Sequence, residues 1–270
     1  MKIYDCFIYL DENFLVDLRF NILNNFVDYF VVVESNRTWQ GNNKRFNFNI
    51  KKFKKFSNKI IYIKVKDMPE GENPWLRENF QRNCIIRGLK NAKNEDLIII
   101  SDADEIPCPQ KIINFDLKKK FGVFEQKQYY YKLNLHNVTN PIWRGSKACI
   151  KKYLKSPQWL RQLKIRKRPF WRLDKINLNY SIENGGWHFC NLKTPYQLLY
   201  KYKNLCEYRD NYVFFNKIDE NFLNKKIILN NIKNQKDLIG RDDIFEKMKI
   251  DISYPKYILD NIKKFKSWVI

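Results

Sequence analysis

The sequence has no apolar stretch near the roughly 18–20 residues that a helix needs to cross a bilayer, which excludes an integral membrane protein. Its six cysteines are scattered and form no CxxC pair. We therefore expect reduced thiols, with neither a disulfide framework nor a structural zinc site. Glycine is also scarce, with eight in 270 residues, and no Gly/Ser linker interrupts the chain. These absences predict a single domain without a flexible hinge.

The N-terminus lacks the pattern of a secretory signal peptide. Residues 1–10 lead directly into a strand-like pattern with an acidic residue at Asp5. A signal peptide instead needs a basic start, an apolar segment and a small-residue cleavage site. We expect a cytoplasmic protein on this basis.

Acidic residues are outnumbered, because 51 Lys+Arg against 29 Asp+Glu give a net charge of +22. Such a field attracts nucleic acid, anionic membranes or phosphorylated small molecules, and it does not determine the fold. The basic segments 51–55 and 161–172, with Trp159 and Trp171 interleaved, fit a surface that grips phosphates and stacks bases. A basic nucleic-acid-binding protein and a metal-dependent nuclease or phosphatase are therefore the alternatives. No RNP, zinc-finger or helix-turn-helix signature is present, so no specific nucleic acid is expected.

Strand-like and helix-like patterns alternate over roughly the first 105 residues. The strands are predicted at 3–10, 29–33, 60–65 and 96–100, and the helices at 14–26 and 75–89. This alternation predicts an α/β fold, a Rossmann-like, mostly parallel sheet flanked by helices. The less regular remainder has predicted strands at 121–133, 162–173 and 187–192, and predicted helices at 195–208, 219–232 and 255–265.

Three carboxylates, Asp102, Asp104 and Glu105, directly follow the fourth predicted strand. Ligands of open α/β sheets bind outside the carboxyl ends of the strands. In extended backbone the side chains of Asp102 and Asp104 point the same way, and a divalent cation between them would relieve their repulsion. Such hard oxygen ligands suit Mg²⁺ or Mn²⁺ bridged to a substrate phosphate. The segment predicts metal-assisted departure of a phosphate-type leaving group, a chemistry that nucleases and phosphatases share.

Two further segments carry candidate binding residues. His188 lies in the segment GGWHF, where the glycine pair permits close backbone approach. It either completes the metal sphere, binds a phosphate, or is a core histidine that bonds a backbone carbonyl. Arg82 stands one helical turn after Glu78, which is the spacing of a routine surface ion pair. The functional alternative is that Arg82 or Arg77 approaches a substrate diphosphate, because a guanidinium matches phosphate oxygens.

Taken together, these segments resemble glycosyltransferase family 17. The resemblance covers nearly the whole chain in one order, through YDCFIYLDENFLVDLRFNIL, VDYFVVVESNRTWQG, WLRENFQRN, SDADEIP, GGWHF and YPKYILDN. It implies a GT-A type fold, a UDP-sugar donor, typically UDP-GlcNAc, and inversion at the anomeric carbon. One catalytic domain would then have a nucleotide-sugar-binding half, 1–107, and an acceptor-side half, 108–270.

The resemblance also implies positions for the donor and its cation. Asp102 and Asp104 would hold Mn²⁺ or Mg²⁺ and the donor diphosphate, and His188 matches the GWH motif of the family. The residues expected near the nucleotide, or matching the first helix of the family, are Glu12, Arg19, Glu34, Ser35 and Asn36.

An inverting transfer needs a carboxylate base near the acceptor. The candidates, in order, are Glu183, Glu207 and Glu105. The expected acceptor is a glycan or a lipid-linked glycan of a bacterial or viral surface. The basic segments would also allow peripheral contact with anionic lipids at the inner membrane face.

Overall fold

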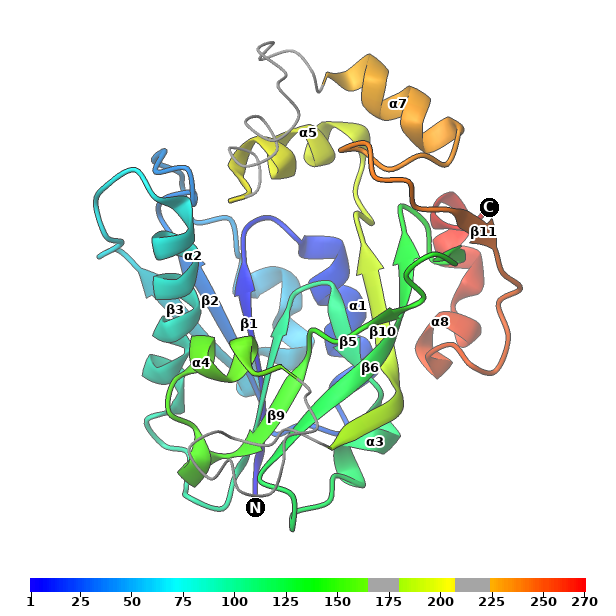
Figure 1. Cartoon of the computed structure of the whole chain (residues 1–270). Coiled ribbons are helices and arrows are strands. Elements are labelled where there is room, and N and C mark those ends of the chain that lie inside the picture. Colours follow the sequence, from blue (N-terminus) through cyan, green and yellow to red (C-terminus); the bar gives the residue numbers. More distant parts are fainter. Residues whose placement is uncertain (165–179, 207–223) are drawn as a thin grey trace, which may run out of the picture.

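The structure is a computed structural model that describes residues 1–164, 180–206 and 224–270. Within these residues one eleven-stranded sheet runs through the molecule, with helices on both faces (Figure 1). The N-terminal strands are β1 (Ile3–Tyr9), β2 (Tyr29–Ser35), β3 (Ile60–Val65) and β4 (Leu97–Asp102). They are parallel and lie in the order β3-β2-β1-β4. Their carboxyl ends therefore meet at one edge of the sheet.

The second half of the chain extends the same sheet. Its strands are β5 (Glu105–Pro107), β6 (Phe121–Tyr130), β7 (Leu135–Asn137), β8 (Ile142–Trp143), β9 (Lys147–Ile150), β10 (Ser181–Cys190) and β11 (Phe245–Lys247). Strand β9 is antiparallel to both β4 and β6, and β10 runs parallel to β6. The long ladders are parallel and the antiparallel ones are short. The predicted α/β fold with a mostly parallel sheet is confirmed.

Helices and 3-10 helices surround the sheet (Figure 1). The α-helices are α1 (Asn13–Leu23), α2 (Pro74–Asn83), α3 (Pro109–Ile113), α4 (Pro157–Gln162), α5 (Pro195–Asn204), α7 (Lys225–Lys233) and α8 (Lys256–Asp260), and the 3-10 helices are η1 (Ile50–Lys59), η2 (Cys84–Leu89), η3 (Lys151–Tyr153) and η4 (Ile262–Trp268). Helices α5 and α7 lie beyond the carboxyl edge of the sheet (Figure 1). Helices α2 to α5 each begin with a proline, whose fixed φ suits the first turn. None of the helices within the described ranges combines the length and the apolar character that a membrane span requires.

The two faces of the sheet bury separate apolar clusters. Helix α1 packs with η1, α8 and η4 over one face, and α2, η2 and α4 cover the other. Alternation along β1 sends Phe7 to the first cluster and Cys6 and Ile8 to the second. The same alternation along β4 directs Asp102, at the end of that strand, toward α2 and α4.

Several predicted elements differ in detail. The predicted helix 75–89 divides into α2 and η2, and the strand predicted at 121–133 ends at Tyr130, before a residue with φ of 60°. Strands β5, β7, β8, β9 and β11 span at most four residues and are too short for a periodicity to reveal. The predicted strand 162–173 and the ends of the helices predicted at 195–208 and 219–232 fall largely or partly outside the described residues.

A buried ion pair joins α1 to the sheet. Arg19 donates from Nε and Nη2 to the two carboxylate oxygens of Asp5, at 2.6 and 2.5 Å, and neither residue is exposed. Its Nη1 donates to the backbone carbonyls of Glu105, at 2.6 Å, and Asp102, at 3.1 Å. The prediction that Arg19 contacts a nucleotide is therefore wrong, because protein acceptors surround its guanidinium. Arg19 instead holds the turn that follows β4.

Replacing Arg19 by Met is expected to lower the free energy of unfolding by about 3–5 kcal/mol, because the charge of Asp5 stays buried without its partner. Urea unfolding measures the loss. The matched control is Arg37→Met, which removes a partly exposed pair with Glu70 and should cost less than about 1 kcal/mol. Equal losses in the two variants would contradict the structural role of Arg19.

Candidate active site

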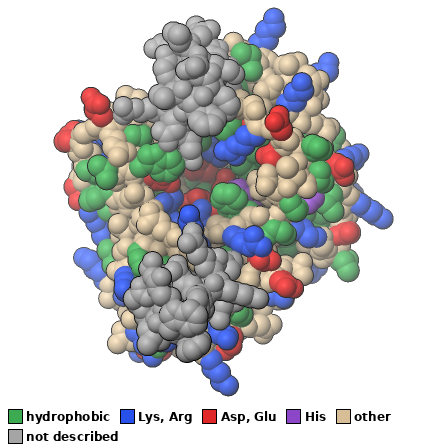
Figure 2. Space-filling view, in the orientation of Figure 1, with side chains coloured by type: hydrophobic (Ala, Val, Ile, Leu, Met, Phe, Trp, Pro, Cys, Tyr) green, Lys and Arg blue, Asp and Glu red, His purple; other side chains and the backbone are tan. Residues whose placement is uncertain are grey.

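A cavity of about 220 Å³ opens at the carboxyl edge of the sheet, near the ends of β1 and β4. Its lining is rich in carboxylates, with cations and aromatic rings beside them. The charged lining residues are Glu12, Glu78, Asp102, Asp104, Glu105, Lys201 and Arg241. Figure 2 shows acidic side chains within the hollow of this face, among basic ones. The cavity is thus a local acidic centre in a strongly basic protein.

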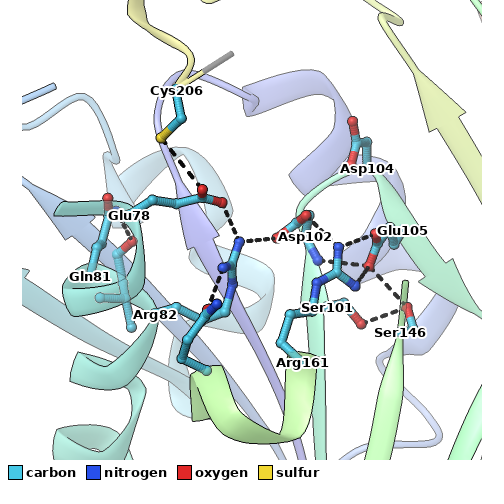
Figure 3. A network of polar contacts seen from close by, with 12 residues as sticks. Glu78, Gln81, Arg82, Ser101, Asp102, Asp104, Glu105, Ser146, Arg161 and Cys206 are labelled. Carbon is cyan, nitrogen blue, oxygen red and sulfur yellow. Dashed lines mark hydrogen bonds and ion pairs between the residues drawn. The ribbon is translucent and has the colours of Figure 1, made fainter. Parts of the chain in front are cut away.

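The two aspartates that follow β4 face different partners. Asp102 Oδ1 lies 3.1 Å from Nη2 of Arg82, and its Oδ2 lies 2.6 Å from Nη2 of Arg161. The chain then turns at 103–104, and Asp104 points away from both arginines (Figure 3). The prediction that Asp102 and Asp104 point the same way is wrong, because the backbone is not extended between them.

Arg82 and Arg161 hold Asp102 from two helices, α2 and α4. Burial opposes ionisation of Asp102, but Arg161 and Arg82 outweigh it and lower the pKa of this carboxyl. Arg82 also contacts Glu78 at 2.5 Å and is buried. Of the two alternatives for Arg82, the ion pair with Glu78 forms, although it is buried and not at the surface. The guanidinium of Arg82 also contacts Asp102, where the other alternative expected a substrate diphosphate. Arg161 was noticed in the sequence only as part of a basic segment.

Glu105 is buried under the cavity and is fully engaged. Both of its oxygens contact Arg161, at 2.8 and 2.6 Å, and Oε1 also accepts from Nε1 of Trp143 at 2.5 Å. The indole of Trp143 in turn stacks on His188, with ring centroids 4.9 Å apart. Gly145 permits this packing, since a Cβ there would come within 1.9 Å of Glu105 Oε1. Glu105 therefore orients its neighbours and is poorly placed to serve as a base.

Asp104 lies next to His188, Cys190 and Lys201. Strand β10 turns His188 and Cys190 to one face, because they are two residues apart. One ligand atom from each of Asp104, His188 and Cys190 lies within 4.8 Å of the others. Lys201 Nζ, from α5, lies 3.5 Å from Asp104 Oδ2. Burial opposes ionisation of Asp104, but Lys201 and His188 outweigh it and hold its pKa well below the usual range.

The structure thus brings together Asp104 and His188 of the predicted cation site and separates Asp102 from them. Sequence reasoning missed Cys190 and Lys201. Alternation from His188 along the predicted strand would have pointed to Cys190, whereas Lys201 carries no signal because lysine is common throughout the chain.

Glu12 lines the cavity beside a second acid, Asp11. Glu12 accepts from the backbone N–H groups of Leu10 and Asp11, and Lys193 binds both carboxylates. Burial would raise the pKa of Glu12, but Lys193 and these backbone donors lower it overall. Burial and the charge of Glu12 raise the pKa of Asp11 to about 6. The pair therefore ionises unequally.

The residues predicted near the nucleotide at the end of β2 support the loop 36–49, which joins β2 to η1. Glu34 is completely buried. It accepts from Lys44 Nζ at 2.5 Å and from the backbone N–H of Asn47 at 2.6 Å, and these contacts fix the second half of the loop. Ser35 is buried too, and its Oγ accepts from the backbone N–H of Arg37. The backbone of Asn36 donates to Val65. None of Glu34, Ser35 and Asn36 lines the cavity.

Arg77 supports the same loop from α2. Its guanidinium donates to the carbonyls of Trp39 and Gly71 and packs under Gly41, whose added Cβ would lie 3.4 Å away. The predicted approach of Arg77 to a diphosphate does not fit this burial. Trp39 at the tip of the loop lines the cavity instead, and sequence reasoning passed over it.

Of the three predicted bases, the structure describes Glu183 and Glu105. Glu183 is exposed and lines a separate depression with Gln110 and Asn114, because it stands at the far end of β10 from His188. That position contradicts its predicted role. Glu207 lies outside the described residues. Glu78, which the sequence analysis treated as a surface ion-pair partner, lines the cavity, and its Oε2 contacts Cys206 Sγ at 3.5 Å.

Comparisons of the sequence with known proteins give one family and one group of relatives. The model of Glycosyltransferase family 17 matches residues 1–269. Human beta-1,4-mannosyl-glycoprotein 4-beta-N-acetylglucosaminyltransferase is 24% identical over 217 residues, which are 69% of this chain and 40% of the human protein. The rat and mouse proteins of that name are also 24% identical over 217 residues, covering 69% of this chain and 39% of their own length. The chain therefore spans about two fifths of these relatives.

Among solved structures, Francisella tularensis 2-C-methyl-D-erythritol 4-phosphate cytidylyltransferase is similar over 56% of this chain and 74% of that chain. The TM-score is 0.27 and the sequence identity is 13%. A likeness of this size carries no argument about the site.

Replacing Gly145 by Ala is expected to destabilise the protein by about 1–3 kcal/mol, because the added methyl group displaces Glu105 and the Trp143 indole. Chemical unfolding measures the loss, and the tryptophan fluorescence of the folded protein should also change. Gly71→Ala is the control, because no atom lies within 4 Å of the Cβ there and only its φ of 102° is strained. Wild-type stability and fluorescence in Gly145→Ala would contradict the packing described.

Asp11 should make stability depend on pH in the acid range. Its folded pKa of about 6 exceeds its ordinary value of 3.8, so the folded state binds a proton that the unfolded chain releases. The contribution of Asp11 to stability is therefore complete below about pH 4 and falls as pH rises to about 6. Relative to wild type, Asp11→Asn should gain unfolding free energy across this window. A difference between the two proteins that is constant from pH 4 to 7 would contradict the shift.

Proposed function

The chain belongs to glycosyltransferase family 17, and we propose that it transfers GlcNAc from UDP-GlcNAc to a glycan hydroxyl, with inversion at the anomeric carbon. A glycosyltransferase uses a nucleotide-sugar donor and a glycan acceptor. The names of the human, rat and mouse relatives support the sugar that is transferred. We extend the activity in those names to the present chain, which covers about two fifths of each relative.

The observation that carries the proposal is the pairing of Asp104 with the ammonium group of Lys201 at the carboxyl edge of the sheet. Lys201 and Arg241 both line the cavity, so a diphosphate there would meet two cations. Asp104 outweighs burial and raises the pKa of Lys201, which stays charged. Fixed charges in a water-poor site stabilise a leaving group without reorganising. The arrangement supports departure of UDP.

A divalent cation fits the same place. Nε2 of the buried His188 lies 3.6 Å from Asp104 Oδ1, and Asp104, His188 and Cys190 form a set of three possible donors. When bound, the cation would offset charge on the departing diphosphate. Asp102, held between Arg82 and Arg161, would fix the turn that presents Asp104. This is the position at which the sequence leads us to expect Mn²⁺ or Mg²⁺.

Inverting transfer is a single displacement. The acceptor oxygen forms a bond to the anomeric carbon as the bond from that carbon to the UDP oxygen breaks, and a base takes the hydroxyl proton. We assign the base to Glu78, because Asp102 and Glu105 have both oxygens held by arginine. In Glu78 a guanidinium holds Oε1, while Oε2 accepts from the Cys206 thiol, a weak donor, at 3.5 Å.

The acceptor is a glycan that can be linked to a lipid, and the protein would then contact an anionic lipid surface. Lys51, Lys52, Lys54 and Lys55 are exposed on η1, while Phe53 between them is buried. This arrangement supports a basic outer surface on the α1 side of the sheet. A cytoplasmic location would be consistent with it.

Glu78→Gln is expected to lower turnover of UDP-GlcNAc at least 100-fold, because general-base catalysis contributes about 10²–10⁴-fold. Binding of UDP-GlcNAc, measured by calorimetry, should stay unchanged. The control is Glu246→Gln, an exposed carboxylate on β11 that should retain wild-type turnover. Wild-type turnover in Glu78→Gln would remove the base assignment.

The donor is tested with the wild-type chain. Thermal shift and slow hydrolysis with UDP-GlcNAc, UDP-Gal, UDP-Glc and GDP-Man should single out UDP-GlcNAc. Preference for another sugar would correct the donor, and the absence of binding to all four would overturn the proposed function.

A further inference from the structure

We propose that the cation site beside Asp104 is a mixed carboxylate–imidazole–thiolate site that selects Zn²⁺, or Co²⁺ as its substitute, over Mg²⁺. The proposal deepens the proposed function, since it concerns the cation of the same cavity. It departs from the oxygen-rich site that the paired aspartates predict. Cys190 is the residue that makes the difference.

The oxygen-rich site does not form, because Asp102 is occupied. Arg82 and Arg161 each hold one of its two carboxylate oxygens, at 3.1 and 2.6 Å. A cation placed on Asp102 would have to compete with both guanidinium groups, of which that of Arg82 is buried. Mg²⁺ requires near-octahedral oxygen coordination at about 2.0–2.1 Å, and one carboxylate with an imidazole and a sulfur is a poor match.

Three other donors converge instead. Asp104, His188 and Cys190 place one ligand atom each within 4.8 Å of the others. Zinc bonds of about 2.0–2.3 Å put two tetrahedral ligands about 3.5 Å apart, so closure requires side-chain movements of about 1 Å. The backbone N–H of Phe189, between the two β10 residues, donates to the carbonyl of Asp104 at 2.9 Å. The turn and the strand are therefore already fixed against each other.

The chemistry of the donors determines which ion they prefer. Thiolate and imidazole ligands suit Zn²⁺ and similar transition-metal ions, whereas carboxylate and water suit Mg²⁺. A coordinating thiol loses its proton on binding such an ion. Three protein ligands also leave the fourth tetrahedral position open, as in catalytic zinc sites. That position would face the cavity, where a diphosphate oxygen could enter.

Neighbouring groups support the site. Trp143 stacks on the ring of His188, and Glu105 fixes the indole through its Nε1. Lys201 lies 3.5 Å from Asp104 and neutralises it when no ion is bound. A divalent ion must compete with this ammonium group, which disfavours ions that bind carboxylate weakly. Thiolate coordination supplies the additional affinity.

The test is a titration of the wild-type chain with Co²⁺, followed by optical absorption. We expect a thiolate-to-cobalt charge-transfer band in the near ultraviolet and intense tetrahedral bands in the visible range. Zn²⁺ should abolish both at stoichiometric amounts, and a 100-fold excess of Mg²⁺ should not. Cys190→Ser should lose the charge-transfer band and bind Zn²⁺ at least tenfold more weakly.

Cys108→Ser is the matched control, because Cys108 is a partly exposed thiol that does not line the cavity and should retain the wild-type spectrum. A wild-type spectrum without the sulfur band, or equal Zn²⁺ affinity in Cys190→Ser and wild type, would overturn the proposal. The wild-type spectrum tests sulfur coordination by itself, even if Cys190→Ser does not fold.

These titrations contain no sugar nucleotide, so they are independent of the proposed function. Sulfur coordination without turnover of any UDP-sugar would support the zinc-type site and overturn the proposed transfer from UDP-GlcNAc. Turnover of UDP-GlcNAc without the sulfur band would support the proposed function and overturn the zinc-type site.

Discussion

The contact on which the site depends is the buried guanidinium of Arg19. It neutralises Asp5 inside an apolar strand and donates to the carbonyls of Asp102 and Glu105, on both sides of the turn. An uncompensated charge at either end would be costly in this interior. The pair therefore fixes helix α1, strand β1 and the acidic turn as one unit. The separation of Asp102 from Asp104 follows from that turn.

Acidic groups of the cavity are paired with basic groups from the surrounding helices. Arginines from α2 and α4 hold Asp102 and Glu105, while Lys201 faces Asp104 from α5. Each carboxylate is thus balanced locally, and the net charge of +22 surrounds a small acidic centre. A nucleotide diphosphate would be attracted by the outer field and would meet its specific contacts only inside. Long-range attraction and local recognition are separate properties of this surface.

The sequence predicted the parallel strands well, because Ile98–Ile100 and Val31–Val33 are β-branched runs whose length and boundaries reveal buried strands. It also selected Asp104 and His188, which the structure brings together. It failed where tertiary geometry decides the outcome. Alternation cannot show that the backbone turns after Asp102, and no local pattern distinguishes Lys201 from the other lysines. The family resemblance implied ligand roles for Arg19 and Glu34, and phosphate chemistry suggested one for Arg77. Their burial by distant segments cannot be read from the neighbouring residues in the sequence.

Strand β10 reaches the site from far along the chain. It pairs with β5 and β6 and brings His188 and Cys190 beside a turn that lies more than 80 residues earlier. Forming such contacts requires closing a long loop before any favourable interaction is gained. We therefore expect the cavity to assemble late in folding, after the β3-β2-β1-β4 sheet. A partly folded chain would carry the native-like β3-β2-β1-β4 sheet while lacking His188 and Cys190, two of the three donors of the proposed cation site.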